Sequence, residues 1–177
     1  MPLSRTLATA LRGLIAALIL LAAARYLAPL VGELYAPGAA SNAISVDDSF
    51  YVQSLARNLA RDGRVHIAGV RTDGFQPLIV YLRAAIAVVT PALSPRGFVV
   101  VSFLLQAVLL VAASALTLRW YRRATGDDEP LGAWLAVALL VSSRFVFLAY
   151  INPLETLLNL VLLLAFLHEW HAPRARP

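Results

Sequence analysis

The organisation of this chain turns on residues 45–63, which read SVDDSFYVQSLARNLARDG. An acidic pair, Asp47 and Asp48, opens a stretch in which apolar residues recur at helical spacing. Either carboxylate is suited to cap the first turn, because free N–H groups and the positive end of the helix dipole attract an anion, and Gly63 is suited to end the helix. The stretch therefore predicts an amphipathic helix over residues 47–62, whose apolar face is formed by Val52, Leu55, Ala56, Leu59 and Ala60.

The composition places most of the chain in a lipid bilayer. Of its 177 residues, 60% are hydrophobic and 14% are charged, and the mean hydropathy is +0.73. Soluble domains average roughly 45–50% apolar and 25% charged residues. The net charge of +5 comes from arginine alone, and in a membrane protein such an excess sets orientation rather than binding nucleic acid. The absence of cysteine excludes disulfides and thiolate metal sites, and His66, His168 and His171 lack the spacing of a zinc metalloprotease.

Long apolar runs predict an all-α integral membrane protein with about four transmembrane helices. The first run follows Arg5 and Arg12, as in a signal peptide, but it is long for one, so a retained span is favoured. The run from Gly97 to Leu118 is the clearest, because its 22 residues would extend about 33 Å and an arginine and aromatic anchor follows them. The four predicted spans are residues 13–31, 97–118, 131–150 and 154–168.

Residues 32–96 are predicted to form one extracytoplasmic loop. Within it, residues 76–92 are apolar but short, and Arg83 at their centre would cost roughly 2.5–3.5 kcal/mol to insert. If this segment does not cross the membrane, the acidic pair and Glu155 lie on one side, and the arginines of the N-terminus, of residues 119–123 and of the C-terminus lie on the other. If it crosses, the carboxylates are split between the two faces. We therefore expect an interfacial or re-entrant helix over residues 76–92 and both termini in the cytoplasm.

Asp47 and Asp48 are the strongest candidates for chemistry. A carboxylate at a helix start beside a membrane acts as a general base when it reaches the proton that it must take. The alternative is a plain N-cap with a solvated neighbour. The catalytic interpretation is favoured by the scarcity of other acids in the loop and by the expected position of Glu155 on the same surface. The loop arginines either hold a lipid phosphate or form a solvated face against anionic headgroups; these are Arg57, Arg61, Arg64 and Arg71.

Three stretches together resemble the glycosyltransferases of the GT-C superfamily, multi-spanning enzymes that use polyprenyl-phosphate-linked sugars. Residues 47–63 resemble their first extracytoplasmic loop. Residues 72–78, TDGFQPL, look like the TNGFHPL stretch of a bacterial branch, with Asp73 in place of Asn and Gln76 in place of His. Residues 152–156, NPLET, are similar to its NGMET turn, and the three stretches occur in the right order.

The resemblance implies that Asp47 is the catalytic base and that Asp48 assists it or binds substrate. Asp47 would deprotonate the acceptor hydroxyl while the sugar leaves the lipid phosphate with inversion. The resemblance implies no organic cofactor and leaves a divalent metal open. It implies as partners membrane lipid, a polyprenyl-phosphate sugar donor and a glycan or protein acceptor, at the inner membrane of a bacterium. The substrate-binding residues that it implies are Tyr51, Arg57, Asn58, Asp73, Gln76 and Glu155.

Enzymes of this superfamily carry many more spans, so the chain is expected to be the N-terminal part of a larger fold or to need a partner subunit. A second interpretation is a non-catalytic small membrane subunit or scaffold of a cell-envelope complex, with its amphipathic helix facing lipid. That interpretation predicts tolerance of changes in the acidic pair and sensitivity to charges at Leu55 and Leu59. A transporter is less favoured, because only Arg83 and Arg144 are candidates for the mid-membrane and the sequence contains no inverted repeat.

Overall fold

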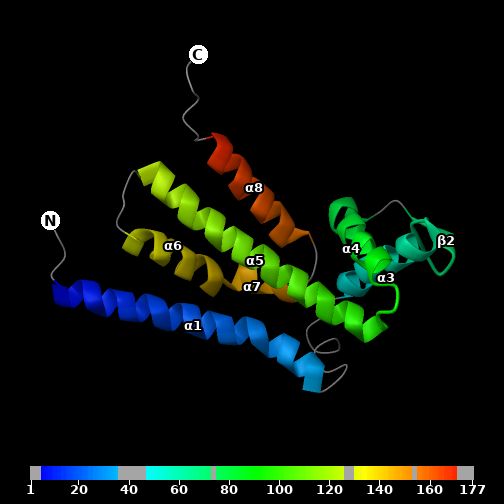
Figure 1. Cartoon of the computed structure of the whole chain (residues 1–177), viewed down its shortest axis with the longest axis horizontal. Coiled ribbons are helices and arrows are strands. Elements are labelled where there is room, and N and C mark those ends of the chain that lie inside the picture. Colours follow the sequence, from blue (N-terminus) through cyan, green and yellow to red (C-terminus); the bar gives the residue numbers. More distant parts are fainter. Residues whose placement is uncertain (1–4, 36–46, 73–74, 126–129, 153–154, 171–177) are drawn as a thin grey trace, which may run out of the picture.

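The computed structural model describes residues 5–35, 47–72, 75–125, 130–152 and 155–170. Of residues 47–50 it describes the backbone alone. The described chain is almost entirely helical, which confirms the predicted helical class. Its elements are α1 (Arg5–Tyr35), α3 (Asp47–Asp62), β1 (His66–Ile67), β2 (Val70–Arg71), α4 (Pro77–Val89), α5 (Pro95–Thr125), α6 (Pro130–Ser142), α7 (Arg144–Ile151) and α8 (Thr156–Trp170) (Figure 1).

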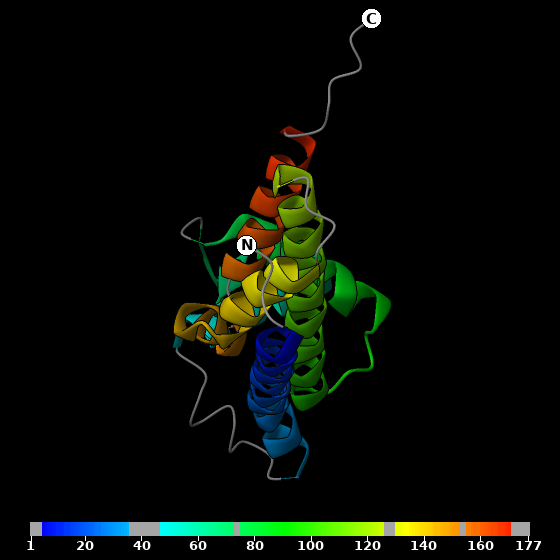
Figure 2. The same cartoon turned by 90° about the vertical axis from the view of Figure 1, so that its left-hand side faces the viewer.

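The elements form two regions that meet at one end of the long helices. Helices α1 and α5 run lengthwise, with α6 and α7 between them and α8 on the other side of α5, whereas α3, the β-hairpin and α4 gather at one end (Figures 1 and 2). At that end, Nη2 of Arg96 donates a hydrogen bond to the carbonyl of Leu34 at 2.6 Å. The last turn of α1 and the first turn of α5 therefore lie together, so the chain between them leaves and returns at the same end.

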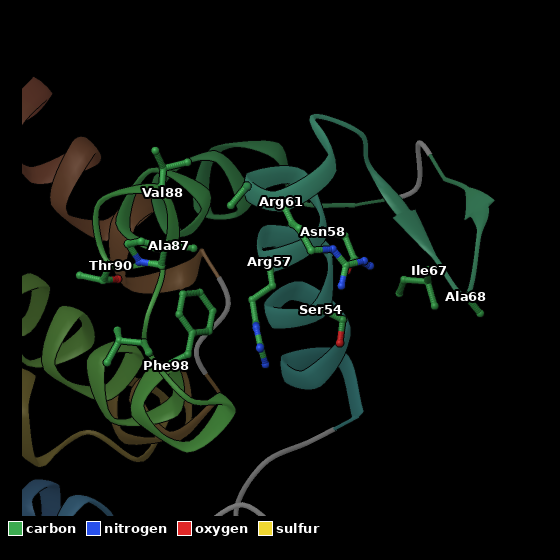
Figure 3. Close-up of a pocket in the computed structure, with 13 residues that line it drawn as sticks. Ser54, Arg57, Asn58, Arg61, Ile67, Ala68, Ala87, Val88, Thr90 and Phe98 are labelled. Carbon is green, nitrogen blue, oxygen red and sulfur yellow. The ribbon is translucent and has the colours of Figure 1, made fainter.

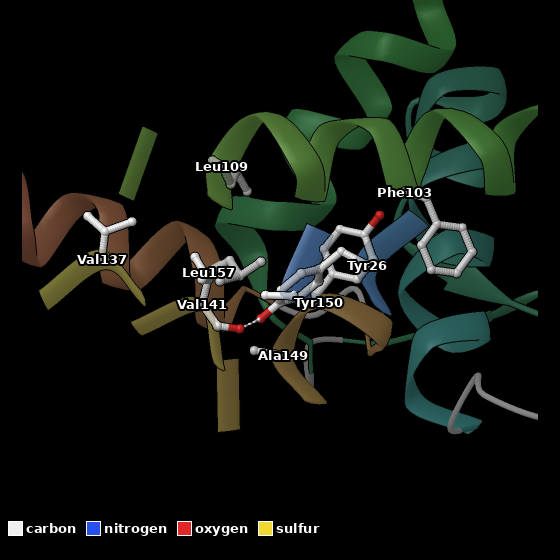
Figure 4. Packing of buried hydrophobic residues seen from close by; sticks show 9 residues of the cluster. Tyr26, Phe103, Leu109, Val137, Val141, Ala149, Tyr150 and Leu157 are labelled. Atoms are coloured by element: carbon white, nitrogen blue, oxygen red, sulfur yellow. Dashed lines mark hydrogen bonds between the residues drawn. The ribbon is translucent and has the colours of Figure 1, made fainter. Parts of the chain in front are cut away.

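An aromatic cluster joins the long helices. The ring of Tyr26 on α1 stands edge-on to Tyr150 of α7, with centroids 4.9 Å apart (Figure 4). It also stands edge-on to Phe147 of α7, at a centroid distance of 5.5 Å. The Tyr26 hydroxyl donates a buried hydrogen bond to the carbonyl of Val141 at 2.9 Å. Val141 lies in the last turn of α6, where carbonyls lack partners in their own helix. The cluster thus supplies both apolar contact and a partner for a helix end.

Two of the helices are long and apolar enough to cross a membrane. These are α1, over residues 6–32, and α5. Helices α6 and α7 qualify only as one bent pair, with a 54° bend between them, so the described residues contain at most three candidate spans. Helices α4 and α8 are shorter. The expectation of four spans therefore stays a prediction.

The predicted span 131–150 is divided at Ser143. That residue has an extended backbone, with φ −62° and ψ 131°, and its N–H bonds the carbonyl of Leu140 at 3.2 Å. Adjacent serines are weak helix formers and are common at sharp kinks. Sequence hydropathy does not register this break, because a window average over residues 131–150 is dominated by the apolar residues on both sides of Ser142, Ser143 and Arg144.

Helix α3 has the bounds of the predicted amphipathic helix, Asp47–Asp62. Its apolar face packs against α4 and the first turn of α5, so it is covered by protein rather than turned to lipid. Gly63 ends the helix as predicted, with φ +65° and its N–H bonded to the carbonyl of Leu59 at 2.9 Å. The buried residues of this α3–α4 interface are Val52, Leu55, Ala56, Ile79, Val80, Ala84 and Phe98.

A two-stranded antiparallel hairpin, which the sequence pattern does not predict, follows α3. His66 pairs with Arg71 and Ile67 with Val70. The two turn residues, Ala68 and Gly69, have φ of 48° and 82°, the positive values that a tight type I′ hairpin turn requires. Alanine is an unusual residue for that conformation, so the common turn signals are absent from the sequence.

Candidate functional site

The three sequence stretches that carry the resemblance are joined by hydrogen bonds. The hydroxyl of Tyr51 on α3 and Oγ1 of Thr72 lie 2.8 Å apart, which links the first stretch to the second. The backbone N–H of Glu155 donates to Oε1 of Gln76 at 3.3 Å, which links the third stretch to the second. Nδ2 of Asn159 lies 3.5 Å from Oε1 of Glu155, one helical turn further along. Three of the predicted site residues, Tyr51, Gln76 and Glu155, thus take part in hydrogen bonds between the stretches.

A cavity of about 650 Å³ lies between the polar face of α3, the hairpin and the end of α4 (Figure 3). We call it the first cavity. One wall is polar and comes from Ser54, Arg57, Asn58 and Arg61 of α3. The other is largely apolar and includes Val88 of α4 and Phe98 of α5. A cavity with one cationic and one apolar wall suits an amphiphile with an anionic group.

The two arginines of the first cavity differ in their availability. Nε and Nη2 of Arg61 donate to the two carboxylate oxygens of Asp62 at 2.8 and 3.0 Å. This fork holds the pKa of Asp62 well below its usual range, helped by a hydrogen bond from His66, and raises the pKa of Arg61. Among the described residues, no carboxylate pairs with Arg57. Arg57 is therefore the cation of this cavity that is free to meet an anion.

Two other predicted site residues take part in internal hydrogen bonds. Nδ2 of Asn58 donates to the carbonyl of His66 at 2.7 Å and so holds the hairpin against α3, although Asn58 also lines the first cavity. Tyr51 is half-buried and its hydroxyl is bonded to Thr72. Both residues shape the site from within.

The remaining predicted residues lie outside what the structure describes. The side chains of Asp47 and Asp48 are not described, although Asp47 is the first residue of α3. Asp73 also lies outside the described residues. Within the described part of the chain, no group of three or more His, Asp or Glu side chains is arranged to hold a metal ion.

Arg83 is the buried charge whose setting sequence reasoning did not foresee. It lies on the inner face of α4 with 1% of its surface exposed. Within the described part of the chain, none of its three guanidinium nitrogens has a hydrogen-bond partner. Burial lowers the pKa of Arg83 to about 10, because desolvation penalises the charged form. The sequence marks Arg83 as unusual, but only the packing of α4 shows that it faces protein rather than lipid.

Comparison with known proteins does not assign a family. No protein-family model matches the chain, and no match is found among curated proteins or solved structures. The function is therefore inferred from the residues and their arrangement.

Proposed function

We propose that this chain is the N-terminal part of a membrane glycosyltransferase of the GT-C kind. It transfers a sugar from a polyprenyl-phosphate donor to a glycan or protein acceptor at the outer face of a bacterial inner membrane. The observation that carries the proposal is the connection of three distant stretches. The Tyr51–Thr72 and Gln76–Glu155 hydrogen bonds join residues that are 21 and 79 positions apart, and these are the stretches that resemble the family.

Asp47 is the proposed base of this reaction. It removes the proton from the acceptor hydroxyl, whose oxygen forms a bond to the anomeric carbon of the donor sugar. The bond from that carbon to the phosphate oxygen breaks, and the lipid phosphate leaves with the electron pair. Its negative charge grows as the bond breaks, so a cation near the phosphate stabilises the transition state.

Arg57 is the proposed partner of that phosphate. It follows Asp47 by ten residues, about 15 Å along the helix axis, and side chains on a helix lean toward its beginning. Figure 3 shows the Arg57 side chain extended in that direction, beside Phe98. A sugar phosphate between the two residues would place its anionic end near Arg57 and its reacting carbon toward Asp47.

The proposed topology has four spans, both termini in the cytoplasm and residues 32–96 outside. Helix α4 supports this arrangement. Its 13 residues extend about 20 Å, less than the roughly 30 Å of a hydrocarbon core. Its outer face is apolar, with Tyr81 and Val89 55% and 76% exposed, whereas Arg83 points inward. A helix of this kind is suited to lie in the membrane interface.

The scaffold alternative receives less support. It requires α3 to offer its apolar face to lipid, but Leu55 and Ala56 are 0% exposed because α4 covers them. Charges at Leu55 would therefore disrupt folding under either interpretation. Tolerance of changes in the acidic pair remains the property that separates the two.

The experiment is Asp47→Asn in the complete enzyme, with transfer from a polyprenyl-phosphate sugar as the readout. We expect transfer to fall by about 10²–10⁴-fold, the usual contribution of a general base. Glu169→Gln, at the exposed end of α8, is the matched control and should transfer normally. A folded Asp47→Asn variant that transfers at nearly the wild-type rate would show that Asp47 is not the base.

A further inference from the structure

A second cavity lies beside the hairpin, and the proposed reaction leaves it without a role. Its volume is about 890 Å³, and it is lined by the end of α3, the hairpin, Phe75 and Tyr81 of α4. We call it the second cavity. Its size falls within the range of small-molecule sites. It therefore has room for more than one sugar ring.

The hairpin register assigns different residues to the two cavities. Side chains alternate between the faces of a strand, and directly paired residues share a face. His66 and Arg71 are such a pair, and both line the second cavity. Ile67 has the opposite direction and lines the first cavity. The hairpin thus presents the apolar side chain of Ile67 to the first cavity and the side chains of His66 and Arg71 to the second.

The second cavity is basic. Arg64 and Arg71 are exposed, and among the described residues neither has a carboxylate partner. Asp62 also lines the cavity, but its two oxygens are already bonded to Arg61 and to Nε2 of His66, the latter at 2.8 Å. Among the described residues of the cavity, therefore, no carboxylate neutralises the charge of the two arginines.

Two aromatic rings complete the lining. Phe75 and Tyr81 stand edge to face, with their centroids 6.3 Å apart and their planes at 70°. Tyr81 is 55% exposed, so part of its ring is open. The face of an aromatic ring carries partial negative charge and attracts the C–H groups of a sugar ring. An open ring beside two free guanidinium groups is a combination that recognises a sugar bearing an anion.

We propose that the second cavity binds the acceptor of the transfer as an anionic saccharide, a sugar chain with carboxylate or phosphate groups. That the saccharide is the acceptor rests on the proposed function, whereas the binding of an anionic saccharide does not. Arg64 and Arg71 meet the anionic groups, since guanidinium forks match carboxylate and phosphate. The Tyr81 ring packs on a sugar face, and Asp62 holds the His66 ring in place through its hydrogen bond.

The test measures binding to the full chain in lipid nanodiscs by calorimetry. The probes are trigalacturonate, which is anionic, and maltotriose, which is neutral and of equal length. We expect trigalacturonate to bind at least tenfold more tightly. Arg64→Gln combined with Arg71→Gln should remove this preference, and Tyr81→Leu should weaken trigalacturonate binding by about tenfold, which corresponds to roughly 1.4 kcal/mol. The control is Arg119→Gln combined with Arg122→Gln, which removes the same charge from the end of α5 and should bind normally.

Three results would overturn the proposal. The first is equal affinity for the two trisaccharides, and the second is an equal loss of binding in the control variant, which would indicate net charge alone. The third is binding to phosphatidylglycerol vesicles that requires Arg64 and Arg71, is unchanged in Tyr81→Leu and prevents trigalacturonate from binding. That result would assign the cavity to a lipid headgroup. Failure of the proposed function is distinguishable, because trigalacturonate binding would persist while Asp47→Asn left transfer unchanged.

Discussion

The long helices and the α3–hairpin–α4 region use opposite rules for placing apolar side chains. In α1, Leu20 and Leu21 are 71% and 70% exposed, whereas Tyr26 is buried. In α3, Leu55 is buried and the arginines point outward. Apolar residues on the outside suit lipid, and polar residues on the outside suit water. The pattern of exposure, rather than total hydrophobicity, therefore distinguishes the two environments within this chain.

Helix α4 stands between these two patterns. Tyr81 and Val89 point outward, as apolar residues do in the long helices, whereas Ile79 and Val80 pack against the water-facing α3 and Arg83 is buried. Helix α4 therefore contributes a core to one region and an apolar surface to the other.

Leu55→Asp should unfold the α3–α4 interface. Leu55 is 0% exposed, and burying an unpaired carboxylate there should cost roughly 3–5 kcal/mol. Ser54→Asp, one residue earlier on the exposed face, is the control and should change the unfolding free energy by less than about 0.5 kcal/mol. Limited proteolysis within residues 47–96 would measure both. Equal protection of the two variants would mean that α3 does not bury this face.

Arg83→Met should stabilise the same interface by about 1–4 kcal/mol. The variant puts an apolar side chain of similar length in place of a buried cation that lacks a hydrogen-bond partner among the described residues. The control Arg64→Met changes an exposed arginine and should be nearly neutral. Thermal unfolding in detergent compares them. A destabilised Arg83→Met variant would show that an anion compensates Arg83 in the native protein.

Tyr26→Phe should destabilise the long helices by about 1 kcal/mol, because the buried carbonyl of Val141 loses its hydrogen bond at the end of α6. Tyr35→Phe, at a side chain 85% exposed, should have no effect. Thermal unfolding of the two variants is the measurement. If Tyr26→Phe matches the wild type, the hydroxyl does not support the break at Ser143.

Ala68→Gly should stabilise the hairpin by less than about 1 kcal/mol. Ala68 has φ 48°, a conformation that costs an alanine more than a glycine, and the gain is reduced by the greater freedom of glycine in the unfolded chain. Hydrogen exchange at Ile67 and Val70 would report it. Ala85→Gly, in the middle of α4, is the opposite control and should destabilise, since glycine disfavours helix interiors. Faster exchange in Ala68→Gly would contradict the turn assignment.

Local signals in the sequence were sufficient for α3. Its period, its acidic start and Gly63 define the helix and its apolar face without knowledge of any neighbour. The same holds for the start of α4, where Pro77 occupies the first turn. The break at Ser143 was not predictable in this way, because hydropathy averages over the two serines and because Tyr26, far away in the sequence, supplies the partner for Val141.

The arrangement of the candidate site could not be predicted from the sequence. Resemblance to a motif singled out Arg57, Asn58, Gln76 and Glu155, but it predicted neither the first cavity nor the hydrogen bond between Gln76 and Glu155. The hairpin was missed, since strands of two residues leave no alternating pattern and Ala68 is not a typical turn residue. The hairpin forms part of the lining of the second cavity, so the cavity could not be predicted from the sequence either.

A disulfide between Gln76→Cys and Glu155→Cys would test whether the second and third stretches meet on one side of the membrane. The chain has no native cysteine, so a crosslink formed in intact membranes reports this pair alone. We expect rapid crosslinking under mild oxidation, because Oε1 of Gln76 accepts the N–H of Glu155, whereas Arg64→Cys with Glu155→Cys should not crosslink. If residues 76–92 crossed the membrane, Gln76 and Glu155 would lie on opposite faces. No crosslink would then form. That result would contradict the contact between the second and third stretches, on which the glycosyltransferase proposal rests.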